Sequence, residues 1–231
     1  KQVIGTNQGS YDLRTVDLDA DGDLDILLAG HFSNNLVWYE NPLYSKLKLK
    51  SFLADADHLE FSHSFTAGTI PDHFDQQHFT DWQVKKGILT GRPAPQEKWK
   101  GGHGKTPALQ VNHWYRNAII QARFLLDDAK SFKLVVNAHH GDHGKYHLFR
   151  VTVTADELVL SKDPDPGVDN SVKLTLATTK LQIPRRQWHT LTAEILDQQV
   201  LVHIDGKFLT RGQHDKLDVL KSSFKFGMAG S

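Results

Sequence analysis

Near-regular alternation of apolar and polar residues between Ala118 and Val153 constrains the fold more than any other feature of the chain. A period of two places successive side chains on opposite faces of a β-strand, whereas an amphipathic helix repeats every three to four residues. The pattern therefore predicts three strands, near residues 118–126, 132–139 and 146–153. The side chains predicted to face a core are Ala118, Ile120, Ala122, Phe124, Leu126, Phe132, Leu134, Val136, Ala138, Phe149, Val151 and Val153.

The other side of these strands is rich in planar hydrogen-bonding groups. Residues 127–131, Asp-Asp-Ala-Lys-Ser, have the polarity and length of a hairpin loop, so the three strands are expected to pair in sequence order. One sheet face would then present five polar residues to solvent, namely Gln121, Arg123, Asn137, His139 and Arg150. This face is too polar to be buried. Because it is also rich in planar hydrogen-bonding groups, we expect it to bind a ligand.

Composition excludes several classes of protein. Lys plus Arg and Asp plus Glu both total 27, so no net field draws nucleic acid to the chain, and no nucleic-acid partner is expected. The absence of Cys excludes disulfides, thiolate nucleophiles and Cys-based zinc sites. No apolar run is long enough to span a bilayer. The chain begins at Lys1 without a signal-like segment, and no closing turn follows its last predicted strand, so we expect a fragment of a longer protein.

Residues 17–25, Asp-Leu-Asp-Ala-Asp-Gly-Asp-Leu-Asp, form the most specific motif. Alternating carboxylates with a glycine at the sixth position can converge on Ca²⁺, which takes six to eight oxygen ligands. We predict a calcium site formed by the side chains of Asp17, Asp19, Asp21 and Asp25 and the carbonyl of Asp23. The alternative is a solvated acidic turn, in which five carboxylates would repel one another without a cation.

This loop differs from an EF-hand, because Leu28 stands at the twelfth position and strands are predicted at residues 26–30 and 36–40. The succession of strand, Asp loop and strand, with a Trp-Tyr-Glu-Asn ending, resembles the FG-GAP/VCBS repeat over about residues 10–42. That repeat is one blade of an integrin-like β-propeller. Because a propeller needs several blades, the resemblance implies either further blades in a longer parent chain or a blade-like appendage on the next domain.

The rest of the chain predicts a second, larger β domain. Clear periodicity is missing between residues 46 and 71, which we interpret as a connector. Short strands follow throughout the remainder, Asp205-Gly206 is a tight hairpin signal, and no long amphipathic helix is present. We therefore predict an all-β protein: a blade with a calcium loop over residues 1–45, and a two-sheet jelly-roll sandwich over residues 72–231.

Residues 74–228 resemble the DUF1080 family, also labelled 3-keto-disaccharide hydrolase, within the concanavalin A-like lectin/glucanase fold. The family's closing Phe-Asp-Asn-x-x-Val strand is absent. That fold serves lectins, carbohydrate-binding modules, glycosidases and lyases, so it does not define the activity. The resemblance is carried by Trp82 with Gly87-Ile88-Leu89, Gly102-His103-Gly104, Phe124, His147 with Arg150-Val151, Trp188-His189-Thr190-Leu191 and Ile204-Asp205-Gly206-Lys207.

Candidate acid/base groups are His139, His147 and Glu194. The two histidines flank a glycine-containing stretch that predicts a hairpin, across which they would approach each other; a surface role for this cluster is favoured over a metal site. Glu194 stands alone in its strand, where a cross-strand ion pair is the favoured alternative. No strand carries the Glu-x-Asp-x-x-Glu pattern of laminarinase-like relatives, which disfavours ordinary hydrolysis.

Three functions stay open. The leading one is a secreted or cell-surface, calcium-containing protein that binds a polysaccharide or oligosaccharide through the predicted polar face, with a rim formed by Trp99 and His103. The second is a glycoside hydrolase or lyase of the 3-keto-disaccharide hydrolase type. The third is a cell-surface adhesion module without glycan specificity.

Overall fold

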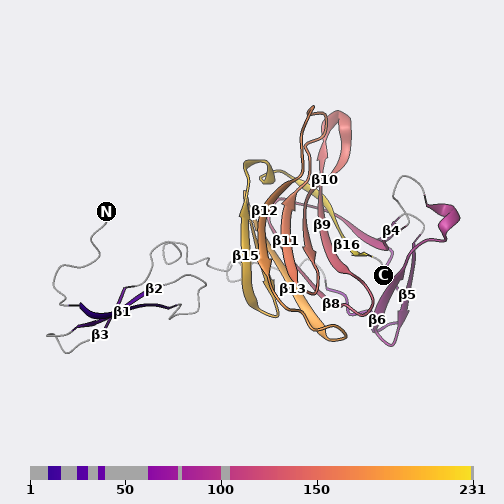
Figure 1. Ribbon diagram of the computed structural model, residues 1–231. Helices are drawn as coiled ribbons and strands as arrows, with labels where there is room; N and C mark the ends of the chain where they lie inside the picture. Colours follow the sequence, from indigo (N-terminus) through magenta and orange to yellow (C-terminus); the bar gives the residue numbers. More distant parts are fainter. Residues whose placement is uncertain are drawn as a thin grey trace. The chain divides into compact units, whose positions relative to one another are not determined.

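The computed structural model describes residues 10–16, 25–30, 36–39, 62–77, 80–99 and 105–229. Internal contacts divide the chain into two compact units, residues 1–51 and residues 52–231 (Figure 1). The predicted connector, residues 46–71, spans this division. No helix in the described ranges is long and apolar enough to cross a membrane.

The first unit contains a three-stranded antiparallel sheet in the order β1-β2-β3. Its strands are β1 (Ser10–Val16), β2 (Asp25–Gly30) and β3 (Leu36–Tyr39). Val16 pairs with Asp25, so the predicted calcium loop joins the ends of two adjacent strands, where an EF-hand would have helices. Asp25 opens β2, whereas Asp17, Asp19, Asp21 and Asp23 lie outside the described residues.

The second unit is a sandwich of two antiparallel sheets, and the predicted all-β class is confirmed. The larger sheet has seven strands in the order β12-β11-β10-β9-β16-β7-β4, and the smaller has four in the order β15-β14-β13-β8; β5 and β6 form a separate pair. The strands are β4 (Phe74–Gln77), β5 (Asp81–Lys85), β6 (Ile88–Arg92), β7 (Ala108–Tyr115), β8 (Ala118–Leu125), β9 (Ser131–His140), β10 (Gly144–Val153), β11 (Glu157–Lys162), β12 (Leu174–Lys180), β13 (Trp188–Leu196), β14 (Gln199–Ile204), β15 (Lys207–Gln213) and β16 (Lys221–Ala229). Single 3₁₀ turns are η2 (Gln96–Lys98), η3 (Gly141–His143) and η4 (Asp215–Leu217).

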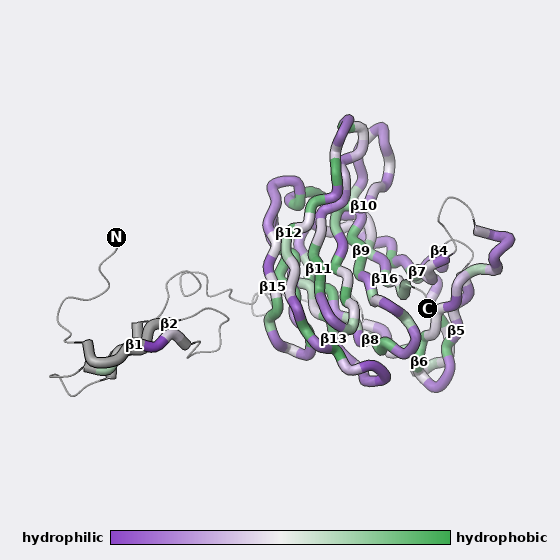
Figure 2. The backbone as a smooth tube through the Cα atoms, in the orientation of Figure 1, coloured by the Kyte–Doolittle hydropathy of each residue, from purple (hydrophilic) through white to green (hydrophobic). Residues whose placement is uncertain are grey.

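The inward faces predicted from alternation are confirmed. Phe124 on β8 and Phe132 on β9 are buried and stack at 4.5 Å between ring centroids. Figure 2 shows the apolar and polar residues alternating along the strands of this unit. Burial of these apolar side chains between the sheets is the main favourable term in folding.

The predicted pairing of β8 with β9 is wrong. β8 pairs with β13 in the four-stranded sheet, whereas β9 pairs with β10 and β16 in the seven-stranded sheet. Leu126, directly after β8, is fully buried, and the chain then passes to the opposite sheet instead of turning back as a hairpin. Gln121 and Arg123 are therefore on a different sheet from Asn137, His139 and Arg150.

The predicted turn at Asp205-Gly206 is confirmed between β14 and β15. Asp205 has φ 53° and Gly206 has φ 78°, the pair of positive values that a type I′ hairpin requires.

Replacement of Phe132 by Ala is expected to lower the free energy of unfolding by about 3–5 kcal/mol, because it leaves a cavity against Phe124 in the sandwich core. Chemical denaturation measures this change. The control is Val172→Ala, at a side chain that is 63% exposed, where less than about 0.5 kcal/mol is expected. Equal effects of the two substitutions would contradict the assignment of Phe132 to the core.

Candidate functional site

The face of the seven-stranded sheet that points away from the core carries the polar side chains of five strands, and we call it the polar face. Directly paired residues share a face of a sheet. One row across it consists of Gln110 on β7, Lys225 on β16, Val135 on β9, Arg150 on β10 and Ser161 on β11. The adjacent row consists of Asn112, Ser223, Asn137 and His147.

Alternation along each strand turns these side chains outward. Lys225 stands between Phe224 and Phe226, which belong to the core or pack against it. Gln110 stands between Leu109 and Val111, both buried. Apolar flanking residues thus commit Lys225 of β16 and Gln110 of β7 to the polar face.

A β-bulge in β10 brings His147 and Arg150 onto the same face. Residues three apart normally point to opposite faces of a strand, but the pairing with β9 shifts register between His147 and Phe149. Leu148 and Phe149 are both fully buried as a result. The bulge thus allows the polar face to use both His147 and Arg150.

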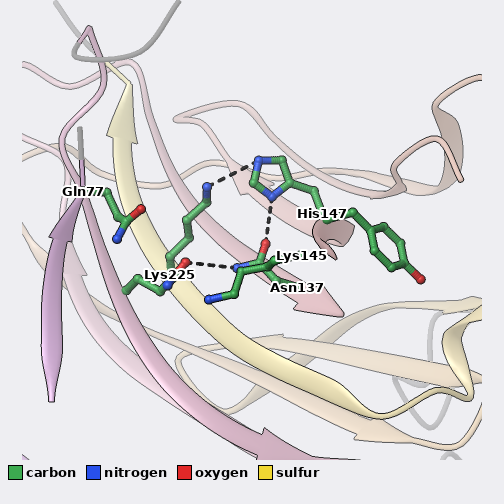
Figure 3. Close-up of a pocket in the computed structure, with 7 residues that line it drawn as sticks. Gln77, Asn137, Lys145, His147 and Lys225 are labelled. Carbon is green, nitrogen blue, oxygen red and sulfur yellow. Dashed lines mark hydrogen bonds between the residues drawn. The ribbon is translucent and has the colours of Figure 1, made fainter. Parts of the chain in front are cut away.

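Asn137 lies at the centre of a hydrogen-bond network on the polar face. Its Nδ2 donates to Ser223 Oγ at 2.8 Å and to Gln110 Oε1 at 3.3 Å, and its Oδ1 lies 2.7 Å from His147 Nδ1. His147 Nε2 is in turn 3.3 Å from Lys225 Nζ (Figure 3). The network orients the imidazole and the amine toward each other from adjacent parts of the sheet.

Four side chains of this network, those of Gln110, Asn137, His147 and Lys225, line a pocket of about 150 Å³. Gln77, Lys145 and Tyr146 complete its lining, and Figure 3 shows Gln77 and Lys225 on one side of it and His147 on the other. Pockets that enclose a drug-sized ligand usually exceed about 300 Å³. This one therefore has room for a substituent or an edge of a sugar ring, rather than for a whole ligand.

Basic groups dominate the surroundings of the pocket. Arg150 Nε donates to Asp163 Oδ2 at 2.8 Å, and the carboxylate of Asp163 is nearly fully buried. Burial, together with the charge of Arg150, lowers the pKa of Lys225 to about 8, and Asp163 only partly opposes this. Burial and the charge of Arg150 also lower the pKa of Lys133, farther along β9.

An exposed aromatic ring lies at one end of the polar face. Trp114 follows Gln110 and Asn112 on the outward side of β7 and is 57% exposed. Its ring centroid lies 6.1 Å from that of His139 on β9, and His139 is paired with Lys145 across the β9–β10 hairpin. An exposed indole of this kind can stack on the face of a sugar ring.

Four of the residues predicted from sequence lie on the polar face: Asn137, His139, His147 and Arg150. Gln121 and Arg123 do not, because β8 belongs to the other sheet; there Gln121 bonds Thr192, and Arg123 lies 5.4 Å from the centroid of Trp188. The expectation that these side chains share one face is therefore wrong for β8 and correct for β9 and β10.

The three candidate acid/base groups do not converge. Glu194 is fully buried on β13, in the four-stranded sheet, with Oε1 2.8 Å from His203 Nε2 on β14. A carboxylate that is closed off from solvent and lies on the other sheet cannot act with His139 and His147 on one sugar. Glu194 is a cross-strand partner of His203, in agreement with the alternative interpretation.

The predicted rim is described only in part. Trp99 is partly exposed, its Nε1 donates to the Ala94 carbonyl at 2.8 Å, and Lys105 Nζ lies 5.4 Å from its ring centroid, so these contacts stay within its own loop. His103 lies outside the described residues. Within the ranges that the structure describes, no three His, Asp or Glu side chains gather in a way that could hold a metal ion.

Sequence reasoning missed Gln110, Lys145 and Lys225. The available signal was a single polar residue between apolar neighbours, as in Leu109-Gln110-Val111 and Phe224-Lys225-Phe226. This pattern places a side chain outward but does not identify the strands that lie next to it.

Comparison with known proteins assigns the fold. No protein-family model matches the chain. No curated protein matches it either. Among solved structures, a laminarinase from Flavobacterium sp. UMI-01 aligns with a TM-score of 0.53 at 12% identity, over 75% of this chain and 89% of that one. The catalytic domain of an endo-1,3-beta-glucanase (laminarinase) from Thermotoga petrophila RKU-1 gives 0.53 at 13%, over 75% and 88%.

Porphyranase B from Zobellia galactanivorans aligns with a TM-score of 0.52 at 7% identity, over 73% of this chain and 78% of that one. The second unit shares the jelly-roll sandwich fold of these enzymes. Identities this low establish the fold alone. The FG-GAP and DUF1080 resemblances remain predictions, since no family model supports them.

Replacement of Lys225 by Met is expected to raise the free energy of unfolding at pH 7 by roughly 1 kcal/mol. This is less than the free energy that corresponds to the full pKa difference, because the side chain is only partly buried. The pKa of Lys225 is about 8 in the folded protein and 10.5 as the unperturbed value, so the unfolded chain binds the proton more tightly. By the same linkage, the stability of the unmodified protein should rise with pH between about 8 and 10.5. Denaturation at several pH values measures both effects.

The control for this substitution is Lys216→Met, at an exposed lysine of η4, which should leave stability unchanged. If Lys225→Met unfolds more easily than the unmodified protein at pH 7, the charge of Lys225 does not destabilise the folded state.

Proposed function

We propose that the second unit binds a polysaccharide through its polar face. The observation that carries this proposal is the pocket formed by side chains of five strands, with the exposed ring of Trp114 at the end of the same face. Amide, imidazole and amine groups pair with sugar hydroxyls, and an exposed indole stacks on the face of a pyranose ring. The glucanases and porphyranase with the same fold, by their names, act on polysaccharides and make this ligand class the natural first test.

Preorganisation supports binding by this face. Asn137 is buried and holds Gln110, Ser223 and His147 through one connected network. Side chains already fixed in this way lose little rotamer freedom when a ligand binds. The small pocket on the polar face suits a chain that lies along the surface, with one substituent in the pocket.

The second candidate function is an enzyme acting on glycosidic bonds, and the pairing of Lys225 with His147 favours it. An amine with a pKa of about 8, 3.3 Å from an imidazole, can accept a proton near neutral pH. Hydrolysis by two carboxylates is not supported by the described part of the polar face, where Asp163 is held by Arg150. This enzyme would therefore work as a base-dependent lyase rather than as an ordinary hydrolase.

We also propose that the first unit binds Ca²⁺ through the loop at residues 17–25 and that the protein is secreted or on the cell surface. Five aspartates within nine residues, between two paired strands, support the cation site. Further blades in a longer parent chain would extend this unit. The buried hydrogen-bond network fixes the side chains around one pocket, which disfavours an adhesion module without glycan specificity.

Replacement of Trp114 by Ala is expected to weaken polysaccharide binding about tenfold or more, because stacking on the indole is lost. Affinity electrophoresis or calorimetry with glycans selected on an array measures the change. Trp188→Ala is the matched control, since Trp188 is 42% exposed but lies on the four-stranded sheet. A protein that binds no polysaccharide, or that loses binding only with Trp188→Ala, would exclude the polar face as the site.

Release of reducing sugar from the bound polysaccharide separates the two candidate functions. A binding module releases none. A lyase should release sugar, and Lys225→Met should lower the rate by about 100-fold or more, because the base is lost. Release that persists in Lys225→Met would exclude Lys225 as the base.

Titration of Ca²⁺ into chelator-treated protein is expected to give heat of binding and to raise the melting temperature of the first unit. Combined Asp19→Asn and Asp21→Asn substitutions should abolish both effects, because two of the charged ligands are removed. Asp128→Asn, in the loop after β8, is the control. An unmodified protein that gives neither heat nor stabilisation would exclude the calcium site.

A further inference from the structure

The polar face carries more positive than negative charge around its pocket. Lys225, Lys145, Lys133 and Arg150 lie on three neighbouring strands. Of these four, only Arg150 has a carboxylate at ion-pair distance among the residues that the structure describes, and that carboxylate belongs to Asp163. Three lysines therefore remain without a carboxylate partner in this part of the molecule.

Other acidic groups near this face do not offset the lysines. The Asp165 carboxylate binds Lys162 Nζ at 2.6 Å, and Glu157 binds Lys180 on the far strands of the sheet. Asp75 pairs with Gln110 and so shares the row of Lys225, but it is exposed on the edge strand β4 and its carboxylate contacts Gln77. Asp165 and Glu157 are thus engaged by other lysines, and Asp75 lies at the edge of the sheet.

The basic groups lie close enough together for their positive charges to repel one another. Lys225 and Arg150 share a row with one strand between them, which puts their backbones about 10 Å apart. The charge of Arg150 lowers the pKa of both Lys225 and Lys133, in addition to the effect of burial. A negative charge placed among these groups would remove this repulsion.

The lysines also retain unused donors. Lys145 Nζ donates to Asn112 Oδ1 at 2.9 Å, and Lys225 Nζ contacts His147 Nε2 at 3.3 Å. An ammonium group has three N–H donors, so each has two left after the contact described. Both amines belong to residues that line the pocket of about 150 Å³.

We propose that this site is specific for an anionic polysaccharide, with a carboxylate or sulfate group of the sugar chain bound in the pocket between Lys225 and Lys145. Charge-assisted hydrogen bonds from the two amines hold the anion, and Arg150 and Lys133 contribute to the field around it. Trp114 contacts the adjoining sugar ring at the end of the same face. The proposal rests on the proposed function and adds the chemical class of the ligand.

Matched pairs of polysaccharides test the charge requirement. Polygalacturonate is compared with its carboxyl-reduced form, and a sulfated galactan with its desulfated form, by calorimetry at fixed ionic strength. At least one charged member is expected to bind ten times more tightly than its neutral counterpart, and the two pairs distinguish carboxylate from sulfate. Affinity should also fall as salt is raised, because the contact is between charges.

Three substitutions test the location. Lys225→Met and Lys145→Met are each expected to weaken binding of the charged member about tenfold and to affect its neutral counterpart much less, so that the affinity difference between the two members narrows. Lys216→Met removes the same charge from an exposed position outside the seven-stranded sheet and should have no effect. Because Lys225→Met is expected to be at least as stable as the unmodified protein, loss of binding in this variant cannot be attributed to unfolding.

The possible outcomes separate anionic specificity from polysaccharide binding itself. Equal affinity for neutral and charged members overturns the anionic specificity but leaves polysaccharide binding intact. Equal losses from Lys216→Met and Lys225→Met indicate nonspecific ion exchange and also overturn it. Absence of binding to all four polysaccharides and to neutral glucans overturns the proposed function itself.

Discussion

Apolar side chains of two antiparallel sheets meet in the layer that contains Phe124 and Phe132, and burial of this layer determines where the remaining side chains point. Side chains alternate along a strand, so a face committed to the core leaves the other face to solvent. Lys225 points outward because Phe224 and Phe226 point inward. The polar face is thus a consequence of the same packing that stabilises the sandwich.

Alternation alone was sufficient to predict the strands between Ala118 and Val153 and the side of each that is buried. It was not sufficient to predict their partners, because a short polar segment can close a hairpin or connect two sheets. Leu126, at the end of the predicted strand, is buried as alternation predicted, so its burial does not distinguish the two cases. Pairing depends on which faces meet across the core, and that information is spread along the whole chain.

As with the strand pairing, only the part of the candidate site that lies on neighbouring segments of the chain was predictable from the sequence. Asn137, His139, His147 and Arg150 lie on two strands joined by one hairpin, so their proximity followed from local sequence. Lys225 is on β16, far from that hairpin in sequence, and only the sheet order brings it to His147. The bulge between His147 and Phe149 is also invisible to a strict period of two, which would have turned His147 inward.

The place of β16 between β7 and β9 has a consequence for biosynthesis. β16 is the last strand of the described chain, and it supplies Ser223 and Lys225 to the centre of the larger sheet. Until residues 221–229 have left the ribosome, β7 and β9 each lack a neighbour and expose backbone groups that can pair with other chains. The nascent protein therefore completes the polar face last, and premature termination shortly before β16 would yield a product that lacks Lys225 and is prone to aggregate.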